Sequence, residues 1–107
     1  MKIDVTPAII DVDGKPVMTV NKEKEQVELT LRAVCVNALI MPKQNNNLTG
    51  EEKIRNDELA RKIYNNNMVD FEAEEISWLL KGINDLYPAP VIYAQAKKML
   101  SIKENKE

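Results

Sequence analysis

Residues 29–41 constrain the fold of this chain more than any other stretch. Val36 and Ile40 face one side of a helix drawn through them, and the remaining apolar residues recur three and four apart on the other side. These remaining residues are Leu31, Val34, Cys35, Ala38 and Leu39. Because a helix that is apolar on nearly every side must be covered on nearly every side, we expect residues 31–41 to form the central helix of a small domain.

The length and composition indicate an ordinary globular protein. A chain of 107 residues is close to the commonest domain size, so we expect residues 1–107 to form a single domain. Its 15 basic and 17 acidic residues are mixed along the chain, which argues against a broad phosphate-binding face. The single cysteine, the lack of a signal-peptide pattern and the lack of a long apolar run favour a cytoplasmic protein with no membrane partner.

The residues before the central helix predict extended structure. Residues 8–12 and 17–20 are rich in β-branched side chains, and the Asp-Gly-Lys-Pro sequence at residues 13–16 is a turn signal. The pattern therefore predicts a β-hairpin over about residues 8–20. Because two strands alone are only marginally stable, we expect the hairpin to pack on the helices or to pair with another chain.

Three further helices are predicted after the central one. Thr49 and Glu52 have the spacing of a capping box, which predicts a helix over residues 50–64. Apolar residues three and four apart predict a helix over residues 72–87, and a proline suited to a first helical position predicts a last helix over residues 90–102. The fold class is therefore α+β, mostly α, with an N-terminal β-hairpin packed on about four short helices.

No residue pattern indicates catalysis or a cofactor. The chain has no histidine, which is the usual general base and zinc ligand. Cys35 falls on the predicted buried face of the central helix, where we expect a small core residue and not a nucleophile. The Asp-Val-Asp-Gly sequence at residues 11–14 resembles the start of a calcium loop, but the position of the bidentate glutamate falls on Lys22. We therefore expect a non-enzymatic protein with no catalytic residue, no metal site and no cofactor.

Trp78 is the first candidate for binding a partner. It lies about 200° round the helix from Ile76, opposite the apolar stripe, and Gly82 and Asp85 lie on the same side. Exposed tryptophans are typical of the residues that dominate protein interfaces, so these three residues form a candidate partner-binding site. The alternative is that Trp78 covers the hairpin or another helix of the same chain.

The second predicted helix carries a candidate nucleic-acid-binding set. Its basic residues are Lys53, Arg55, Arg61 and Lys62. They are interleaved with acidic residues, so the alternative is a solvated face held by salt bridges within the helix.

Three segments, together with the Asp-Gly-Lys-Pro turn, make up a pattern that extends over most of the chain. They are Leu-Thr-Leu at 29–31 with Val-Asn-Ala-Leu at 36–39, Leu-Thr-Gly-Glu-Glu-Lys-Ile-Arg at 48–55 with Glu-Leu-Ala at 58–60, and Tyr-Pro-Ala-Pro-Val at 87–91 with Gln-Ala at 95–96. In this pattern the chain resembles a group of small proteins encoded by tailed bacteriophages and prophages. The resemblance implies a setting, the cytoplasm of a bacterial host, and no mechanism.

These observations predict an accessory protein of a phage or prophage that acts by protein–protein interaction, through a host factor or through self-association. One alternative is a nucleic-acid-binding regulator that uses the second helix. Another is a chaperone of virion head or tail assembly. The expected partner is a protein or a second copy of the chain, and nucleic acid is the partner under the first alternative.

Overall fold

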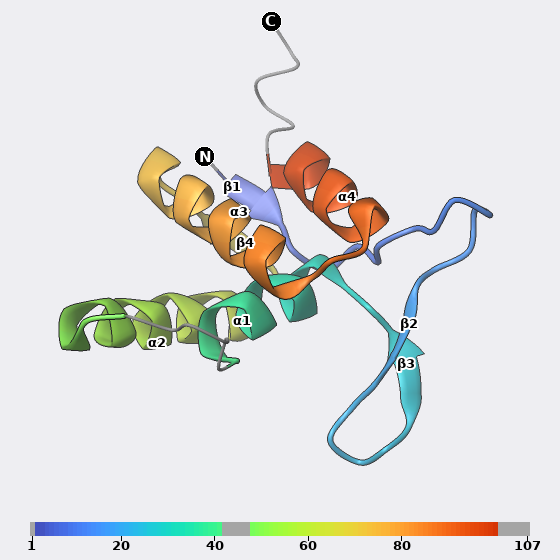
Figure 1. The fold of residues 1–107 in the computed structure, drawn as a ribbon, viewed down its shortest axis with the longest axis horizontal. Helices are drawn as coiled ribbons and strands as arrows, with labels where there is room; N and C mark the ends of the chain where they lie inside the picture. The colour runs from blue at the N-terminus through green and yellow to red at the C-terminus, as the bar shows by residue number, and fades with distance from the viewer. Residues whose placement is uncertain (1, 42–47, 101–107) are drawn as a thin grey trace, which may run out of the picture.

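Helices dominate the computed structural model, which describes residues 2–41 and 48–100 (Figure 1). Within these residues the chain forms four helices and two small antiparallel sheets of two strands each. The fold is therefore α+β and mostly α, with an N-terminal hairpin, as the sequence predicts. None of the helices in this part of the chain is both long and apolar enough to cross a membrane.

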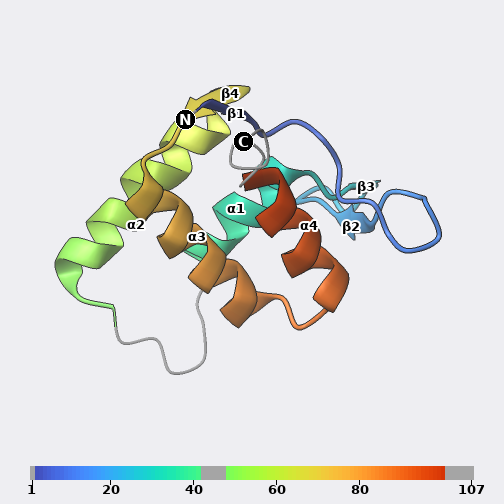
Figure 2. The ribbon, with the colours of Figure 1, turned by 90° about the horizontal axis from the view of Figure 1, so that it is seen from above.

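Helix α1 (Leu31–Ile40) is the centre of the fold. It packs against α2, α3 and α4, and Figure 2 shows these three helices around it. All five residues of its predicted inner face are buried. The first turn is fixed by Thr30, whose Oγ1 accepts a hydrogen bond of 3.2 Å from the backbone N–H of Ala33. The expectation of a central helix with a covered inner face is thus confirmed, whereas Ile40 on its other side is exposed.

The ends of the helices agree with the sequence pattern to within one residue wherever the structure describes them. Helix α2 (Gly50–Tyr64) has the predicted bounds, and α3 (Ala73–Leu86) is one residue shorter at each end. Helix α4 (Pro90–Leu100) begins at the predicted proline, and residues 101 and 102 of that prediction lie outside the described residues. Helix α1 ends one residue early because Met41, which precedes a proline, takes an extended conformation.

Carboxylates and a hydroxyl fix the starts of α2 and α3. Thr49 Oγ1 accepts from the N–H of Glu52 at 3.1 Å, and Glu52 Oε1 accepts from the N–H of Thr49 at 3.0 Å, which is the predicted capping box. At the start of α3, Glu75 Oε1 accepts from the N–H of Glu72 at 2.9 Å. Glu72 therefore lies just before the helix and not in its first turn.

A sheet formed by strands distant in the sequence joins the N-terminus to the helices. Strand β1 (Lys2–Asp4) pairs antiparallel with β4 (Met68–Asp70), and Ile3 lies opposite Val69. Both of these side chains are buried in the core. The sequence does not indicate this pairing, because helices α1 and α2 separate the two strands in the chain.

The hairpin extends further along the chain than residues 8–20, so that predicted boundary is wrong. Strand β2 (Met18–Val20) pairs with β3 (Gln26–Glu28), and the turn between them follows Asn21. The side-chain oxygen of Asn21 accepts from the N–H groups of Glu23 and Glu25 at 2.9 and 3.0 Å, which stabilises this turn. Residues 21–26 are all polar, as in a solvent-exposed loop. The sequence therefore does not indicate that a strand begins at Gln26.

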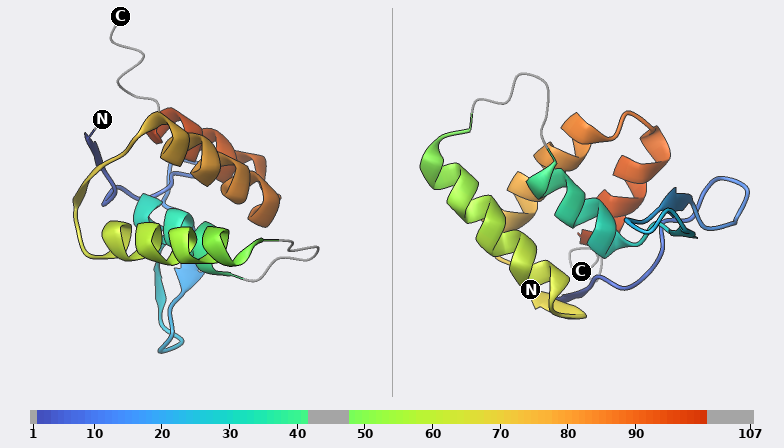
Figure 3. Two further views of the ribbon diagram at one scale, coloured as in Figure 1. Left: turned by 90° about the vertical axis from the view of Figure 1, so that its left-hand side faces the viewer. Right: turned by 90° about the horizontal axis from the view of Figure 1, so that it is seen from below.

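The predicted turn at residues 13–16 also exists, but it closes only an isolated bridge between Ile10 and Pro16. Next to that bridge, Ile9 bonds to the residues just before β2 and just after β3: its N–H donates to the carbonyl of Leu29 at 2.8 Å, and its carbonyl accepts from the N–H of Val17 at 2.8 Å. Ile9 is fully buried and Val17 packs on the core. Residues 10–28, named the arm below, are thus anchored at their base, and Figures 1 and 3 show β2 and β3 extending away from the helices.

Candidate functional site

Trp78 is engaged inside the molecule. Its side chain is half-buried, packs against the core, and donates from Nε1 to Asn56 Oδ1 on α2 at 2.6 Å. The guanidinium carbon of Arg55 lies 5.2 Å from the centre of its ring, a cation–π distance. Of its two companions in the predicted site, Gly82 is buried and Asp85 is exposed, so the three residues share no open face. These contacts agree with the alternative interpretation, in which Trp78 covers another helix of the same chain.

Asn56 is the polar residue that the sequence reasoning missed. It is 5% exposed, and its Nδ2 donates to the carbonyl oxygen of Leu39 at 3.2 Å while its Oδ1 accepts from Trp78. One amide therefore joins α1, α2 and α3. The signal was present in the sequence, because Asn56 lies three and four residues before Leu59 and Ala60, on the apolar stripe of its helix.

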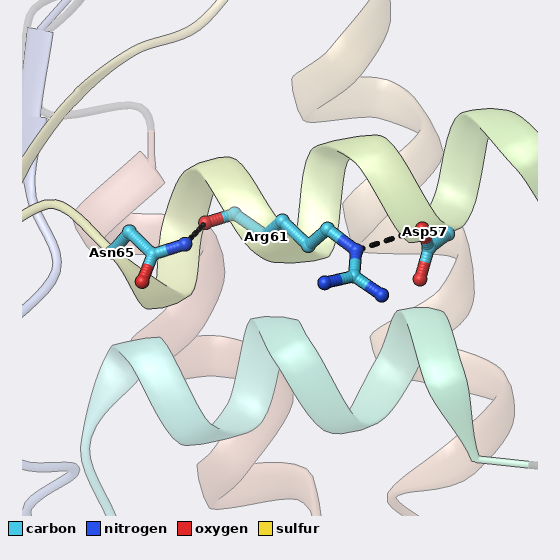
Figure 4. A network of polar contacts seen from close by, with 3 residues as sticks. All are labelled: Asp57, Arg61 and Asn65. Carbon is cyan, nitrogen blue, oxygen red and sulfur yellow. Dashed lines mark hydrogen bonds and ion pairs between the residues drawn. The ribbon is translucent and has the colours of Figure 1, made fainter.

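The four basic residues of α2 are placed in different ways. Arg61 Nε lies 2.9 Å from Asp57 Oδ2, and Lys62 Nζ lies 3.5 Å from Glu75 Oε1 on α3. Asp57 holds the pKa of Arg61 above its ordinary value through a hydrogen bond and its negative charge. Figure 4 shows this pair with Asn65, whose side chain donates to the carbonyl of Arg61 at 2.8 Å.

Of the other two basic residues, Arg55 stacks on Trp78 and Lys53 is exposed. Three of the four basic side chains therefore contact acidic or aromatic groups of the chain itself, as expected for a solvated face with internal pairs. The four side chains form no uninterrupted basic stripe along α2.

Cys35 is a core residue in the structure. It is fully buried in the middle of α1, and burial raises the pKa of its thiol from the ordinary 9.0 to about 12.

Within residues 2–41 and 48–100, no three His, Cys, Asp or Glu side chains gather closely enough to hold a metal ion.

We expect the Cys35 thiol of the native protein to react with a disulfide reagent roughly 100-fold more slowly at about pH 8 than the thiol of the urea-unfolded chain. The raised pKa means that the folded state buries the neutral thiol and disfavours the thiolate. The stability contributed by burial of the neutral thiol is fully present below pH 9, and it is lost as the pH rises from 9.0 towards 12, where the unfolded chain ionises first. Absorbance of the released thiol measures the rate. Rapid, complete reaction without denaturant would contradict the burial of this side chain.

The arm carries the candidate binding surface. Four large apolar side chains of the arm are exposed: Ile10, Val12, Met18 and Val20. Val12, in the turn, is 92% exposed, and Met18 and Val20 on β2 are 50% and 59% exposed. The sequence predicts a hairpin that packs on the helices or pairs with another chain, but it does not show which of its side chains remain in water.

Comparisons of the chain with protein families, with curated proteins and with solved structures found no match.

Proposed function

We propose that this chain is a non-enzymatic accessory protein of a tailed phage or prophage, and that it acts by binding a protein through its arm. The resemblance in sequence supports the setting. The observation that carries the mode of action is the exposure of Val12, Met18 and Val20 on a segment that extends away from the helices. Large apolar side chains that remain in water on a projecting segment suit a surface that another protein covers.

The energetics of the arm fit such a contact. Burial of about half of the exposed apolar surface of three such side chains stabilises a complex by about 2–4 kcal/mol. The arm also carries exposed lysine and glutamate residues, which suit the polar rim of an interface: Lys15, Lys22, Glu23, Lys24 and Glu25. A protein fits this mixture of apolar and oppositely charged groups better than a polyanion does, because the charges of the arm do not form a basic face.

A variant of the arm tests the proposal. The arm variant carries V12S, M18T and V20T, which remove apolar surface and keep residues that suit a turn and a strand. We expect it to capture at least about tenfold less of the protein partner, because the lost burial corresponds to more than about 1.4 kcal/mol. The measurement is affinity capture from a lysate of the bacterium that carries the gene, quantified by mass spectrometry against the unaltered chain.

A matched variant of the helical body provides the control. The body variant carries I54Q, Y64Q and M68T, which remove three exposed apolar side chains outside the arm. A protein captured by the unaltered chain and by the body variant, but lost from the arm variant, supports the proposal. Equal capture by all three chains, or loss from the body variant alone, would overturn it.

A further inference from the structure

We propose that strand β2 pairs edge to edge with β2 of a second copy of this chain, about a twofold axis at Thr19. This inference rests on the proposed function, since it uses the same arm, and it names one partner: the chain itself. Four observations support it, concerning the open backbone groups of the edge, the register, the side chains on the edge and the charges on the other strand.

The backbone groups of β2 alternate in direction. Leu29 N–H donates to the carbonyl of Val17 at 2.7 Å, and Asn21 N–H donates to the carbonyl of Glu25 at 3.0 Å, so Val17 and Asn21 face β3. Thr19, between them and opposite Val27, faces β3 as well. The N–H and C=O groups of Met18 and Val20 therefore point to the outer edge of β2.

That outer edge is open in the structure. The segment before the strand does not cover it, because Val17 donates to Ile9 and Asp11 donates to Lys15 on the same side as β3. Within residues 2–41 and 48–100, β3 is the one strand paired with β2. The edge thus presents two N–H groups and two C=O groups that a further strand can bind.

One antiparallel register satisfies all of these groups. With the twofold axis at Thr19, Met18 lies opposite Val20 of the second copy, and each pair exchanges two hydrogen bonds. A shift of the axis to Met18 places Val20 opposite Pro16, which has no N–H to donate. A shift to Val20 places Met18 opposite Lys22, which lies in the turn and not in the strand. The edge is therefore complementary to itself in the register centred on Thr19.

The side chains favour the same pairing. Met18 and Val20 lie on one face of β2, so each apolar side chain lies directly across from an apolar side chain of the second copy. The outer edge of β3, by contrast, presents Gln26 and Glu28. Charged residues on an edge oppose its pairing with another copy. Self-association is therefore specific to β2.

The short edge determines the strength of the contact. A three-residue strand buries much less than the roughly 1,200–2,000 Å² of a stable interface, so the dimer is weak and reversible. It therefore forms at high protein concentration and leaves the edge open at low concentration.

Cysteine cross-linking tests both the dimer and its register. In the proposed pairing the two Thr19 residues face each other in a pair without hydrogen bonds, at a Cα separation of about 4.5 Å, which a disulfide can bridge. We expect T19C at about 100 μM, in glutathione buffer, to form disulfide dimers at least about tenfold faster than M18C. Random collisions predict the opposite order, because Met18 is the more exposed side chain. Cys35 does not interfere, because it is buried.

Sedimentation of the unaltered chain gives a second readout that needs no substitution. We expect its average mass to rise above that of the monomer between about 10 μM and 1 mM. A constant monomer mass over this range, or cross-linking of T19C no faster than of M18C, would overturn the pairing. Both experiments use the purified chain alone. If the unaltered chain stays monomeric but the arm variant loses a captured protein, the pairing fails and the proposed function stands. If the unaltered chain dimerises but the arm variant captures the same proteins, the proposed function fails and the pairing stands.

Discussion

Replacement of Leu31 by alanine is expected to lower the free energy of unfolding by about 2–5 kcal/mol. Leu31 has no exposed surface and begins α1, the helix that α2, α3 and α4 cover. The shorter side chain removes buried methyl groups and leaves a cavity in a close-packed core. Since domains of this size are stable by about 5–15 kcal/mol, the loss is a large part of the total. Urea unfolding followed by the fluorescence of Trp78 measures it.

Ile40→Ala is the matched control, because it removes an apolar side chain from the same helix at a site that is 56% exposed. We expect this change to lower the free energy of unfolding by less than about 1 kcal/mol. Equal losses from Leu31→Ala and Ile40→Ala would mean that α1 is not covered in the way the structure shows.

Asn56→Ala is expected to cost about 2–4 kcal/mol, a loss comparable to that of a core truncation. The substitution leaves the indole N–H of Trp78 and the carbonyl of Leu39 without the amide that binds both. Buried polar groups that lose their partners bear most of their desolvation cost. The emission of Trp78 is also expected to shift, since its hydrogen bond and its packing on α2 change together. Chemical unfolding gives the stability, and the native emission spectrum gives the shift.

Asn65→Ala is the control for this prediction. Asn65 also bonds to a backbone carbonyl on α2, that of Arg61 at 2.8 Å, but it is exposed. Water can replace that bond, so we expect a change of less than about 0.5 kcal/mol. If Asn56→Ala were as mild as Asn65→Ala, the amide would not join the three helices in solution.

The helices were predictable because their signals are local. The capping box of Thr49 and Glu52 and the proline at position 90 each fix an end within a few residues of sequence. The inner face of α1 follows from its periodicity, and all five of its predicted residues are buried. In each case the residues that give the signal lie in or directly beside the helix that they predict.

The strands and the site were harder to predict because their partners are distant. The pairing of β1 with β4 depends on where α1 and α2 place Met68–Asp70. Helical periodicity placed Trp78 off the core stripe of α3, but it contains no information about α2, which supplies Asn56 and Arg55. Likewise, β-branched residues along the arm predict strands, whereas the exposure of Val12 depends on where the arm lies relative to the helices.

The packing of α2, α3 and α4 on α1 holds the fold together, whereas the proposed binding surface lies on the arm, a separate part of the chain. The most direct test of this separation measures two quantities on the arm variant, its free energy of unfolding and its affinity for a protein that the unaltered chain captures. We expect its free energy of unfolding to lie within about 1 kcal/mol of that of the unaltered chain, because the three side chains are exposed. We expect its affinity for the captured protein to be at least about tenfold weaker. Unchanged binding by a folded arm variant would contradict the assignment of the binding surface to the arm.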